Sequence, residues 1–257
     1  MGWIRNWRRR RVLARHAIDA ALWDRVVRAL PFLAGLPHAQ QARLEAYAVV
    51  FLAEKEFTLL RGIELTEEDR LSIALQACLP VLELGLEWYD GWTGVLVYPG
   101  DFRVQREEVD EDGVVHAWQD ELSGESWPGG PVVLSWQALG EAGSVAAGGI
   151  NVVIHEFAHK IDLRSGEADG LPPLHRGMSA ARWRSALLDA YEGFRDALDR
   201  GRVTWLDPYA AENPAEFFAV ASEAFFEAPN EMRRRYADLY EQFTLFYRQD
   251  PAARLSA

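Results

Sequence analysis

Residues 155–159 read His-Glu-Phe-Ala-His, and this pattern constrains the fold of the 257-residue chain more than any other feature. The pattern lies in the apolar run VVIHEFAHKIDL, which predicts a helix that begins after Asn151 and ends near Gly166. Residues four apart on a helix lie one above the other, so His155 and His159 share one face. Two imidazoles placed in this way can bind one Zn²⁺ ion, so the sequence predicts a helix that supplies two metal ligands.

Glu156 lies about 100° further round the same helix, as 3.6 residues per turn require. From there its carboxylate can reach a water on the metal rather than the metal itself. Zinc lowers the pKa of such a water to about 7. Glu156 would take the proton of this water during attack and pass it to a leaving amine, which is the chemistry of peptide hydrolysis.

A catalytic zinc normally has three protein ligands, so a third one must lie elsewhere in the chain. The metzincin pattern requires Gly at position 162 and His at position 165, where this chain has Asp162 and Ser165. Thermolysin-like enzymes take a Glu about twenty residues downstream, but no Glu occurs between Glu167 and Glu192. Both of these classes are therefore excluded.

Three side chains remain as candidates for the third ligand: His175, Glu216 and Glu223. The two glutamates are seven residues apart on an apolar segment, and a buried carboxylate needs a partner such as a metal. Glu216 also has a structural reading. With Asn213 as N-cap and Pro214 as the first helical residue, it would be the third-position acid of a capping box. The residues alone leave the choice open.

The rest of the chain has a mainly helical pattern with a few strands. Apolar residues at helical spacing predict helices over 12–88, 180–200 and 213–247, the last segment as a pair. Short apolar runs bounded by turn residues predict strands at 95–98 and 132–136, and a hairpin over 103–120 that turns at 110–113. The order of helices, strands and helices predicts an α+β fold, mainly helical with a small sheet.

Composition excludes several classes of protein. A hydrophobic content of 49% excludes intrinsic disorder as the main state. The single cysteine, Cys78, cannot form an internal disulfide, and its apolar neighbours predict that it is buried. No apolar stretch is long enough to span a bilayer, and the N-terminal segment does not have the pattern of a secretory signal. We therefore expect a cytoplasmic protein.

Charge is unevenly distributed along the chain. The first sixteen residues contain six arginines and no acid, which leaves a net charge of −18 on the rest. This acidic part of the chain, the body, argues against direct binding of nucleic acid, because such binding requires clustered positive charge. The basic arm mixes arginines with Trp3 and Trp7, a combination that could contact anionic lipid or a partner protein. The favoured reading is a solvated first helix whose arginines face water or the acidic body.

Longer segments around these residues resemble a known family. HEFAHKID (155–162), SGEADGLPPL (165–174) and YAAENPAEFFAVASEAFFEAP (209–229) are similar to the Mlc titration factor A family of zinc peptidases, which is related to the anthrax lethal factor catalytic domain. FLAEKEF (51–57), IALQACLPVLELG (73–85), VLVYPGDF (95–102) and PVVLSWQ (131–137) also resemble family segments, in the family's order.

The resemblance implies a gluzincin-type metallopeptidase core with one Zn²⁺ per chain. The ligands it implies are His155, His159 and Glu216, with Glu156 as the catalytic base. It also implies that Tyr209 stabilises the transition state, and a phenol beside zinc can donate a hydrogen bond to a developing oxyanion.

Three further features have a possible place in such a site. Glu223 could orient a ligating imidazole, as carboxylates often do. Asp162 competes for this position, although an exposed acid at the helix end is its favoured reading. PVVLSWQ (131–137) could be an edge strand that pairs with a substrate backbone, or equally an internal strand of the sheet.

The resemblance also implies a function and a partner. It implies aminopeptidase-like action on peptides and binding of a transcriptional repressor that regulates sugar uptake. The alternative is a non-catalytic protein in which zinc organises the fold or an interface while the repressor is sequestered. Glu156 and Tyr209 favour the enzyme, because a structural site needs neither. We expect a basic arm over 1–20, a helical N-terminal lobe over 21–88 and a zinc metallopeptidase lobe over 89–257.

Overall fold

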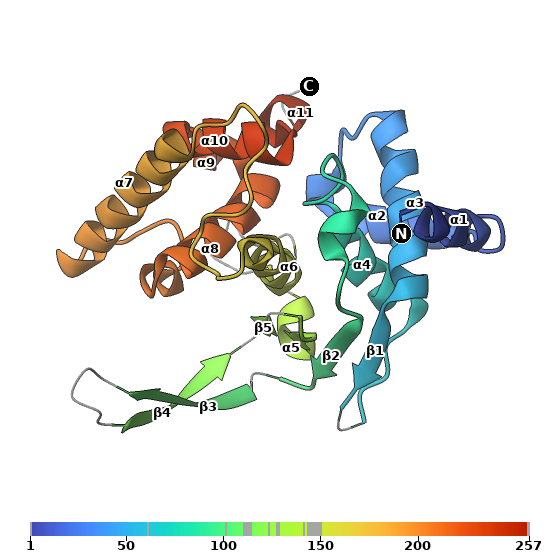
Figure 1. The fold of residues 1–257 in the computed structure, drawn as a ribbon, viewed down its shortest axis with the longest axis horizontal. Coiled ribbons are helices and arrows are strands. Elements are labelled where there is room, and N and C mark those ends of the chain that lie inside the picture. The colour runs from blue at the N-terminus through green and yellow to red at the C-terminus, as the bar shows by residue number, and fades with distance from the viewer. Residues whose placement is uncertain are drawn as a thin grey trace.

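The computed structural model describes the backbone of residues 2–60, 62–100, 102–109, 115–122, 124–126, 129–140, 142 and 151–255, with side chains except at residue 2 and residues 102–126. The turn predicted at 110–113 lies outside the described residues. The elements confirm an α+β fold that is mainly helical with a small sheet. Figure 1 shows helix α6, which carries the His-Glu-Phe-Ala-His pattern, between α1 to α4 on one side and α7 to α11 on the other.

The N-terminal helices are α1 (Gly2–Leu13), α2 (Ala20–Ala29), α3 (His38–Glu54) and α4 (Glu67–Cys78). Helix α4 begins after Thr66, which forms a capping box with Asp69. Cys78, the last residue of α4, is buried, as its apolar neighbours predict. Burial raises the pKa of its thiol.

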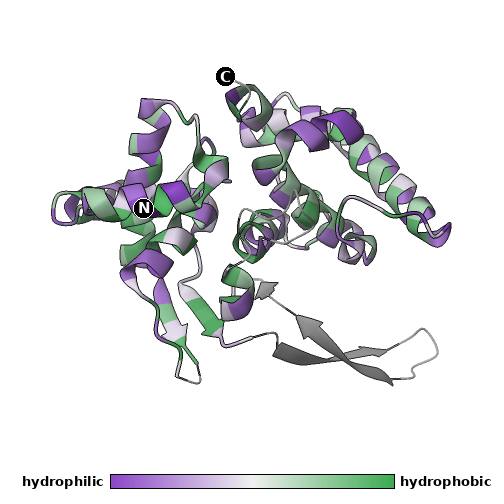
Figure 2. Ribbon diagram, turned by 180° about the vertical axis from the view of Figure 1, so that it is seen from behind, coloured by the Kyte–Doolittle hydropathy of each residue, from purple (hydrophilic) through white to green (hydrophobic). Residues whose placement is uncertain are grey.

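The main sheet has four strands in the order β1-β2-β6-β5, with bounds β1 (Glu56–Leu59), β2 (Gly94–Tyr98), β6 (Val132–Ser135) and β5 (Gly124–Ser126). β1, β2 and β6 run parallel, and β5 pairs antiparallel with β6. The predicted hairpin is a separate antiparallel pair, β3 (Phe102–Val109) and β4 (Val115–Leu122). Figure 2 shows β2 as a hydrophobic strand, in keeping with the burial of Val95 and Val97.

One expectation about strands is wrong, and the structure decides between two readings of a second segment. β1 lies inside the segment 12–88, which the sequence assigns entirely to helices. Its four residues alternate in exposure, but Phe57 also continues the helical spacing of α3, so periodicity alone hides the strand. The segment 131–137 is not an edge strand, because β6 lies between β2 and β5 with all four of its residues buried. A continuous apolar run is the pattern of a strand covered on both faces.

The C-terminal half contains α5 (Trp136–Leu139), α6 (Val152–Asp162), α7 (Ala180–Asp199), α8 (Pro214–Glu227), α9 (Pro229–Arg235), α10 (Ala237–Tyr247) and α11 (Pro251–Leu255). The pair of helices predicted over 213–247 is therefore three, since α8 ends before Pro229. A proline has no N–H to continue the helix, but it fits the first position of the next one.

Aromatic packing anchors α6 in the core. The ring of Phe157 lies 5.0 Å from Tyr89, 5.6 Å from Phe51 and 5.7 Å from Trp92, measured between ring centroids. These partners come from both sides of residue 88, and the β1–β2 pairing also joins the two segments. The division into lobes at 88/89 stays a prediction, while the core itself is continuous across that point.

Candidate metal centre

The start of α6 is held by Asn151. Its side-chain oxygen accepts a hydrogen bond from the backbone N–H of Ile154 at 2.9 Å, which caps the helix. Its side-chain amide donates to Gln76 of α4 at 2.8 Å and also to Glu227 of α8. This buried residue therefore ties α6 to two neighbouring helices and fixes the direction in which its polar face points.

That face brings three potential ligand atoms together. Nε2 of His155 lies 3.0 Å from Oε2 of Glu216, and Nε2 of His159 lies 3.2 Å from the same oxygen. The two Nε2 atoms are 3.2 Å apart. Nitrogen and oxygen ligands about 2.0–2.1 Å from a tetrahedral zinc are about 3.3 Å from one another, so this triangle has nearly the size of one face of a zinc site. Within the described part of the chain, this is the one group of His, Cys, Asp or Glu residues that could hold a metal.

Glu223 sets the protonation of one imidazole. Its Oε1 lies 2.8 Å from Nδ1 of His155, and its other oxygen accepts from the backbone N–H of Asn151. A proton on Nδ1 donates to Glu223 and leaves the Nε2 lone pair directed at the triangle. Two imidazole nitrogens and a carboxylate oxygen are a typical donor set for zinc, so these residues fit such an ion.

Glu216 has the predicted position in the helix, but its carboxylate lies beside the two imidazoles. Asn213 caps α8, because its side-chain oxygen accepts from the N–H groups of Ala215 and Glu216 at 2.9 and 3.0 Å. Glu216 is thus the third residue of a capped helix, as expected, while its carboxylate turns to the imidazoles. Burial raises its pKa, but hydrogen bonds with His155 and His159 outweigh burial and hold the pKa well below its ordinary value.

The pKa values of the other site groups are shifted by burial, and the partners of each group oppose this shift. Burial lowers the pKa of His155, but hydrogen bonds with Glu216 and Glu223 outweigh it and raise the pKa well above 6.5. Burial raises the pKa of Glu223 despite its contact with His155. The site therefore gathers carboxylates and imidazoles that interact strongly with one another.

The two residues predicted to be catalytic lie near the triangle in the sequence. Glu156 is on α6, which carries both imidazoles, and Tyr209 precedes α8, which carries the carboxylate of the triangle. Glu156 is buried on α6. Burial lowers the pKa of Lys160 to about 8, and the nearby charge of Glu156 partly opposes this shift. Tyr209 lies on the 3₁₀ turn 208–211 before α8, where Asp207 accepts its backbone N–H at 2.8 Å. Its ring centroid is 6.1 Å from that of His155, and its side chain is partly exposed.

Two other candidates lie away from the triangle. Nε2 of His175 is 2.7 Å from the backbone oxygen of Phe246, and the two rings stack at 5.6 Å, so His175 is not the third member of the group. Asp162 is fully buried, and the reading as an exposed helix-end acid is wrong. The loop after α6 folds back over it, and the N–H of Gly170 donates to Oδ2 at 2.7 Å. Burial raises the pKa of Asp162 to about 7.

Sequence reasoning missed Gln76 and Gly170 as residues that support the site. Gln76 is a polar residue inside the apolar segment IALQACL, a signal that could have identified a buried hydrogen-bonding role. Gly170 shows no such signal, because its role depends on the packing of a loop against distant helices.

No helix in the described ranges is both long and apolar enough to cross a membrane.

Comparison with known proteins identifies the relatives of this chain. Residues 4–248 match the profile of the family described as glucose-regulated metallo-peptidase M90. Mlc titration factor A of Salmonella arizonae is 44% identical over 239 residues, which cover 91% of this chain and 93% of that protein. The proteins of the same name from Salmonella choleraesuis and Salmonella typhi are 43% and 44% identical over 238 residues, covering 91% of this chain and 88% of each relative. The resemblance predicted from the sequence is thus confirmed, while its link to anthrax lethal factor stays a prediction.

A metallopeptidase family implies a metal ion, for which the triangle is the candidate site. This chain belongs to the glucose-regulated metallo-peptidase M90 family.

Proposed function

We propose that the chain is a zinc-dependent peptidase of the gluzincin type, with one Zn²⁺ per chain held by His155, His159 and Glu216. The observation that supports this most is the triangle of two Nε2 atoms and one carboxylate oxygen, with edges of 3.0 to 3.2 Å. Family membership supports a metallopeptidase, and the choice of zinc rests on the imidazole and carboxylate donors.

A bound zinc ion supplies Lewis acidity and lowers the pKa of a water to about 7. The chain supplies the remaining chemistry. Glu156 takes a proton from the attacking water and returns it to the leaving amine. Tyr209 donates a hydrogen bond to the oxyanion that develops on the scissile carbonyl. Glu223 accepts the Nδ1 proton of His155, which leaves the lone pair of Nε2 directed at the site.

The proposed substrates are peptides, cleaved in an aminopeptidase-like manner in the cytoplasm. The relatives are named Mlc titration factor A, which supports binding of an Mlc-type transcriptional repressor and a link to sugar uptake. The net charge of −12 favours contact with the protein surface of such a repressor over contact with its DNA.

The substitution Glu156→Gln tests the catalytic proposal. Bound zinc per chain and hydrolysis of a panel of chromogenic aminoacyl and peptide substrates are measured together, with the exposed Glu167→Gln as the matched control. We expect one zinc in all three proteins, and hydrolysis lowered about 10²- to 10⁴-fold in Glu156→Gln alone. Unchanged hydrolysis in Glu156→Gln would refute its role as base. Zinc and repressor binding without hydrolysis in the wild type would favour the non-catalytic alternative.

A further inference from the structure

Helix α1 directs arginines toward the body of the protein. Nε and Nη2 of Arg9 each lie 2.9 Å from one carboxylate oxygen of Glu54, in a bidentate pair with α3. Arg9 also contacts Asp90 at 3.3 Å, and Arg5 pairs with the same carboxylate. Val12 packs against the core from the same face. This face of the arm is therefore docked rather than solvated, and two of its six arginines are used to hold it.

The opposite face of α1 presents large apolar side chains to solvent. Trp3 is 75% exposed, Trp7 52% and Ile4 44%. Seven large hydrophobic residues are exposed in the described part of the chain, and four of them, these three and Leu13, lie on α1. An amphipathic helix on a protein surface normally buries its apolar face and exposes its charged face. α1 instead exposes its largest apolar side chains and turns two arginines to the body, so folding does not account for the outward tryptophans.

Basic side chains flank these tryptophans. Arg8, Arg10 and Arg11 are exposed on the helix, and Arg11 lies over the ring of Trp7 at 4.7 Å. At 100° per residue, Arg10 and Arg11 lie on either side of the line through Trp3 and Trp7. None of the ion pairs among the described residues involves these three arginines. Apolar rings and positive charge thus share one stripe, and hydrophobic and hydrophilic residues alternate along α1 in Figure 2.

We propose that this outer face of α1 docks the protein on an anionic phospholipid surface. Indole rings favour the level of the lipid headgroups, and arginines beside them pair with phosphates. A helix of twelve residues, about 18 Å long, can lie in that plane without spanning it. This inference is independent of the metal centre and of its proposed chemistry.

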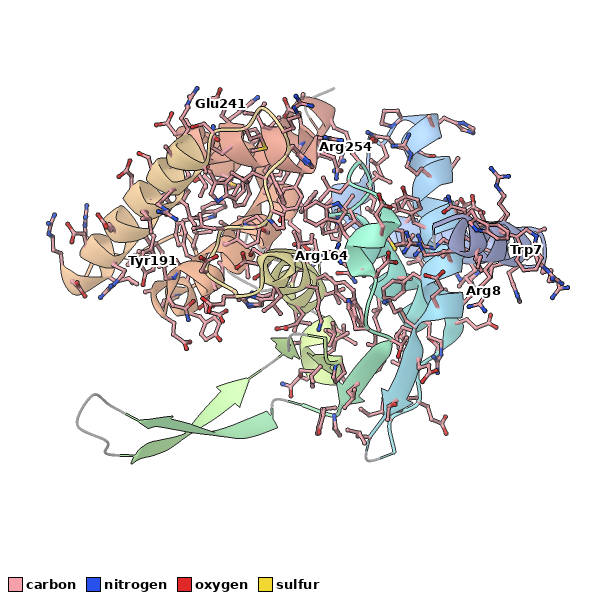
Figure 3. The ribbon with its side chains drawn as sticks, viewed as in Figure 1. Trp7, Arg8, Arg164, Tyr191, Glu241 and Arg254 are labelled. Carbon is pink, nitrogen blue, oxygen red and sulfur yellow. The ribbon has the colours of Figure 1, made fainter. Side chains whose placement is uncertain are left out.

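The shape of the face favours lipid over an acidic protein as its partner. Figure 1 shows α1 at the outer edge of the structure beside α3, and Figure 3 shows Trp7 on the side of α1 away from the other helices. The tryptophans stand on an exposed, convex helix, which matches a flat surface that is apolar and anionic at once. The first sixteen residues contain six arginines and no acid, whereas the rest of the chain has a net charge of −18, so this arm offers clustered positive charge to an anionic surface.

Co-sedimentation of the full-length protein with vesicles tests the proposal. One set of vesicles contains phosphatidylcholine alone, and the other mixes it with phosphatidylglycerol. The variants are Trp3→Ser with Trp7→Ser, and Arg10→Gln with Arg11→Gln. The matched control for charge, Arg184→Gln with Arg202→Gln, removes two exposed arginines elsewhere, and Val203→Ser is the control for an exposed apolar side chain.

We expect the wild type and both controls to bind the anionic vesicles and to release them at high salt. Removal of Arg10 and Arg11 should weaken binding about 25-fold, at about fivefold for each arginine. Removal of the two indoles should weaken it at least as much, with circular dichroism unchanged in every variant. Failure of the wild type to bind, equal binding to phosphatidylcholine alone, or variants that bind like the wild type would each overturn the proposal. Capture of an acidic protein without binding to vesicles would overturn it as well.

Discussion

Nδ1 of His155 lies 2.8 Å from the buried Oε1 of Glu223, so a residue one helix away determines which nitrogen of His155 faces the metal triangle. The other oxygen of Glu223 accepts the backbone N–H of Asn151. One carboxylate therefore connects the cap of α6 to the imidazole that α6 carries. For the proposed zinc site, this connection predicts that the affinity depends on Glu223, which does not itself belong to the triangle.

Glu223→Gln should weaken zinc binding about 10- to 100-fold, because the amide keeps the shape of the side chain but loses the charge that favours the Nδ1 proton. Competition with a chelator measures the affinity. The exposed Glu192→Gln serves as the control and should bind zinc like the wild type. Equal affinities in both variants would show that Glu223 does not tune His155.

His175→Ala should lower stability and leave zinc binding unchanged. The substitution removes the hydrogen bond to the backbone oxygen of Phe246 and the stacked ring, contacts together worth about 1–3 kcal/mol. Denaturant unfolding of the zinc-free protein gives the loss in stability, and zinc per chain is measured on the folded variant. Loss of zinc from a folded His175→Ala protein would contradict the exclusion of His175 as a ligand.

Gly170→Ala should destabilise the protein more than Gly201→Ala. Both glycines have positive φ, 77° and 67°, so the cost of backbone conformation is similar. A Cβ at Gly170 would lie 2.6 Å from a methyl of Leu187 and 2.8 Å from the backbone oxygen of Pro214, whereas a Cβ at Gly201 meets nothing within 4 Å. Steric overlap should add about 1–3 kcal/mol at Gly170. Denaturant titration measures the free energy of unfolding of both variants. Equal losses would show that the loop around Gly170 accommodates the Cβ without a loss of stability.

Lys55 should make stability rise with pH above pH 8. Its ammonium donates to the backbone oxygens of Tyr89 and Trp92, but burial lowers its pKa from 10.5 to about 8, although Glu54 and Asp90 partly oppose the shift. Between pH 8 and 10.5 the unfolded chain therefore holds more protons at this residue than the folded one, and stability increases with pH across that window.

The comparison with Lys55→Met isolates this contribution. The free energy of unfolding of the wild type, minus that of the variant, should rise between pH 8 and 10.5 by no more than about 3 kcal/mol, the full value of the shift in pKa. Lys160 and Arg9 contribute positive charge near Lys55 and are present in both proteins. A difference that stays flat or falls over this range would contradict a lowered pKa.

Much of the site could be predicted because its signals are local. The spacing of His155 and His159 places them on one helical face, and Asn213 followed by Pro214 marks the start of α8. The residues alone could not choose Glu216 over His175 or Glu223, since that choice depends on how α8 packs against α6. The resemblance to a family made the choice, and the structure brings Glu216 to the two imidazoles.

The errors arose where tertiary contacts outweigh local pattern. β1 follows α3 directly, and it is pairing with β2, distant in the sequence, that makes it a strand. Asp162 looks like a surface acid at a helix end until a loop closes over it through Gly170. The arginines of α1 face water or acids of the body, as expected, but the pattern could not identify the two acids, Glu54 and Asp90, because they lie 45 and 81 residues further along the chain.

The proposed zinc site is best tested by the zinc content per chain of three purified proteins, the wild type, Glu216→Ala and Glu192→Ala, together with X-ray absorption at the zinc edge. We expect one zinc in the wild type and in the Glu192→Ala control, coordinated by nitrogen and oxygen with two imidazoles. We also expect that zinc is lost from Glu216→Ala while the protein stays folded. Full zinc occupancy in Glu216→Ala, or a ligand set without two imidazoles, would contradict the proposed site.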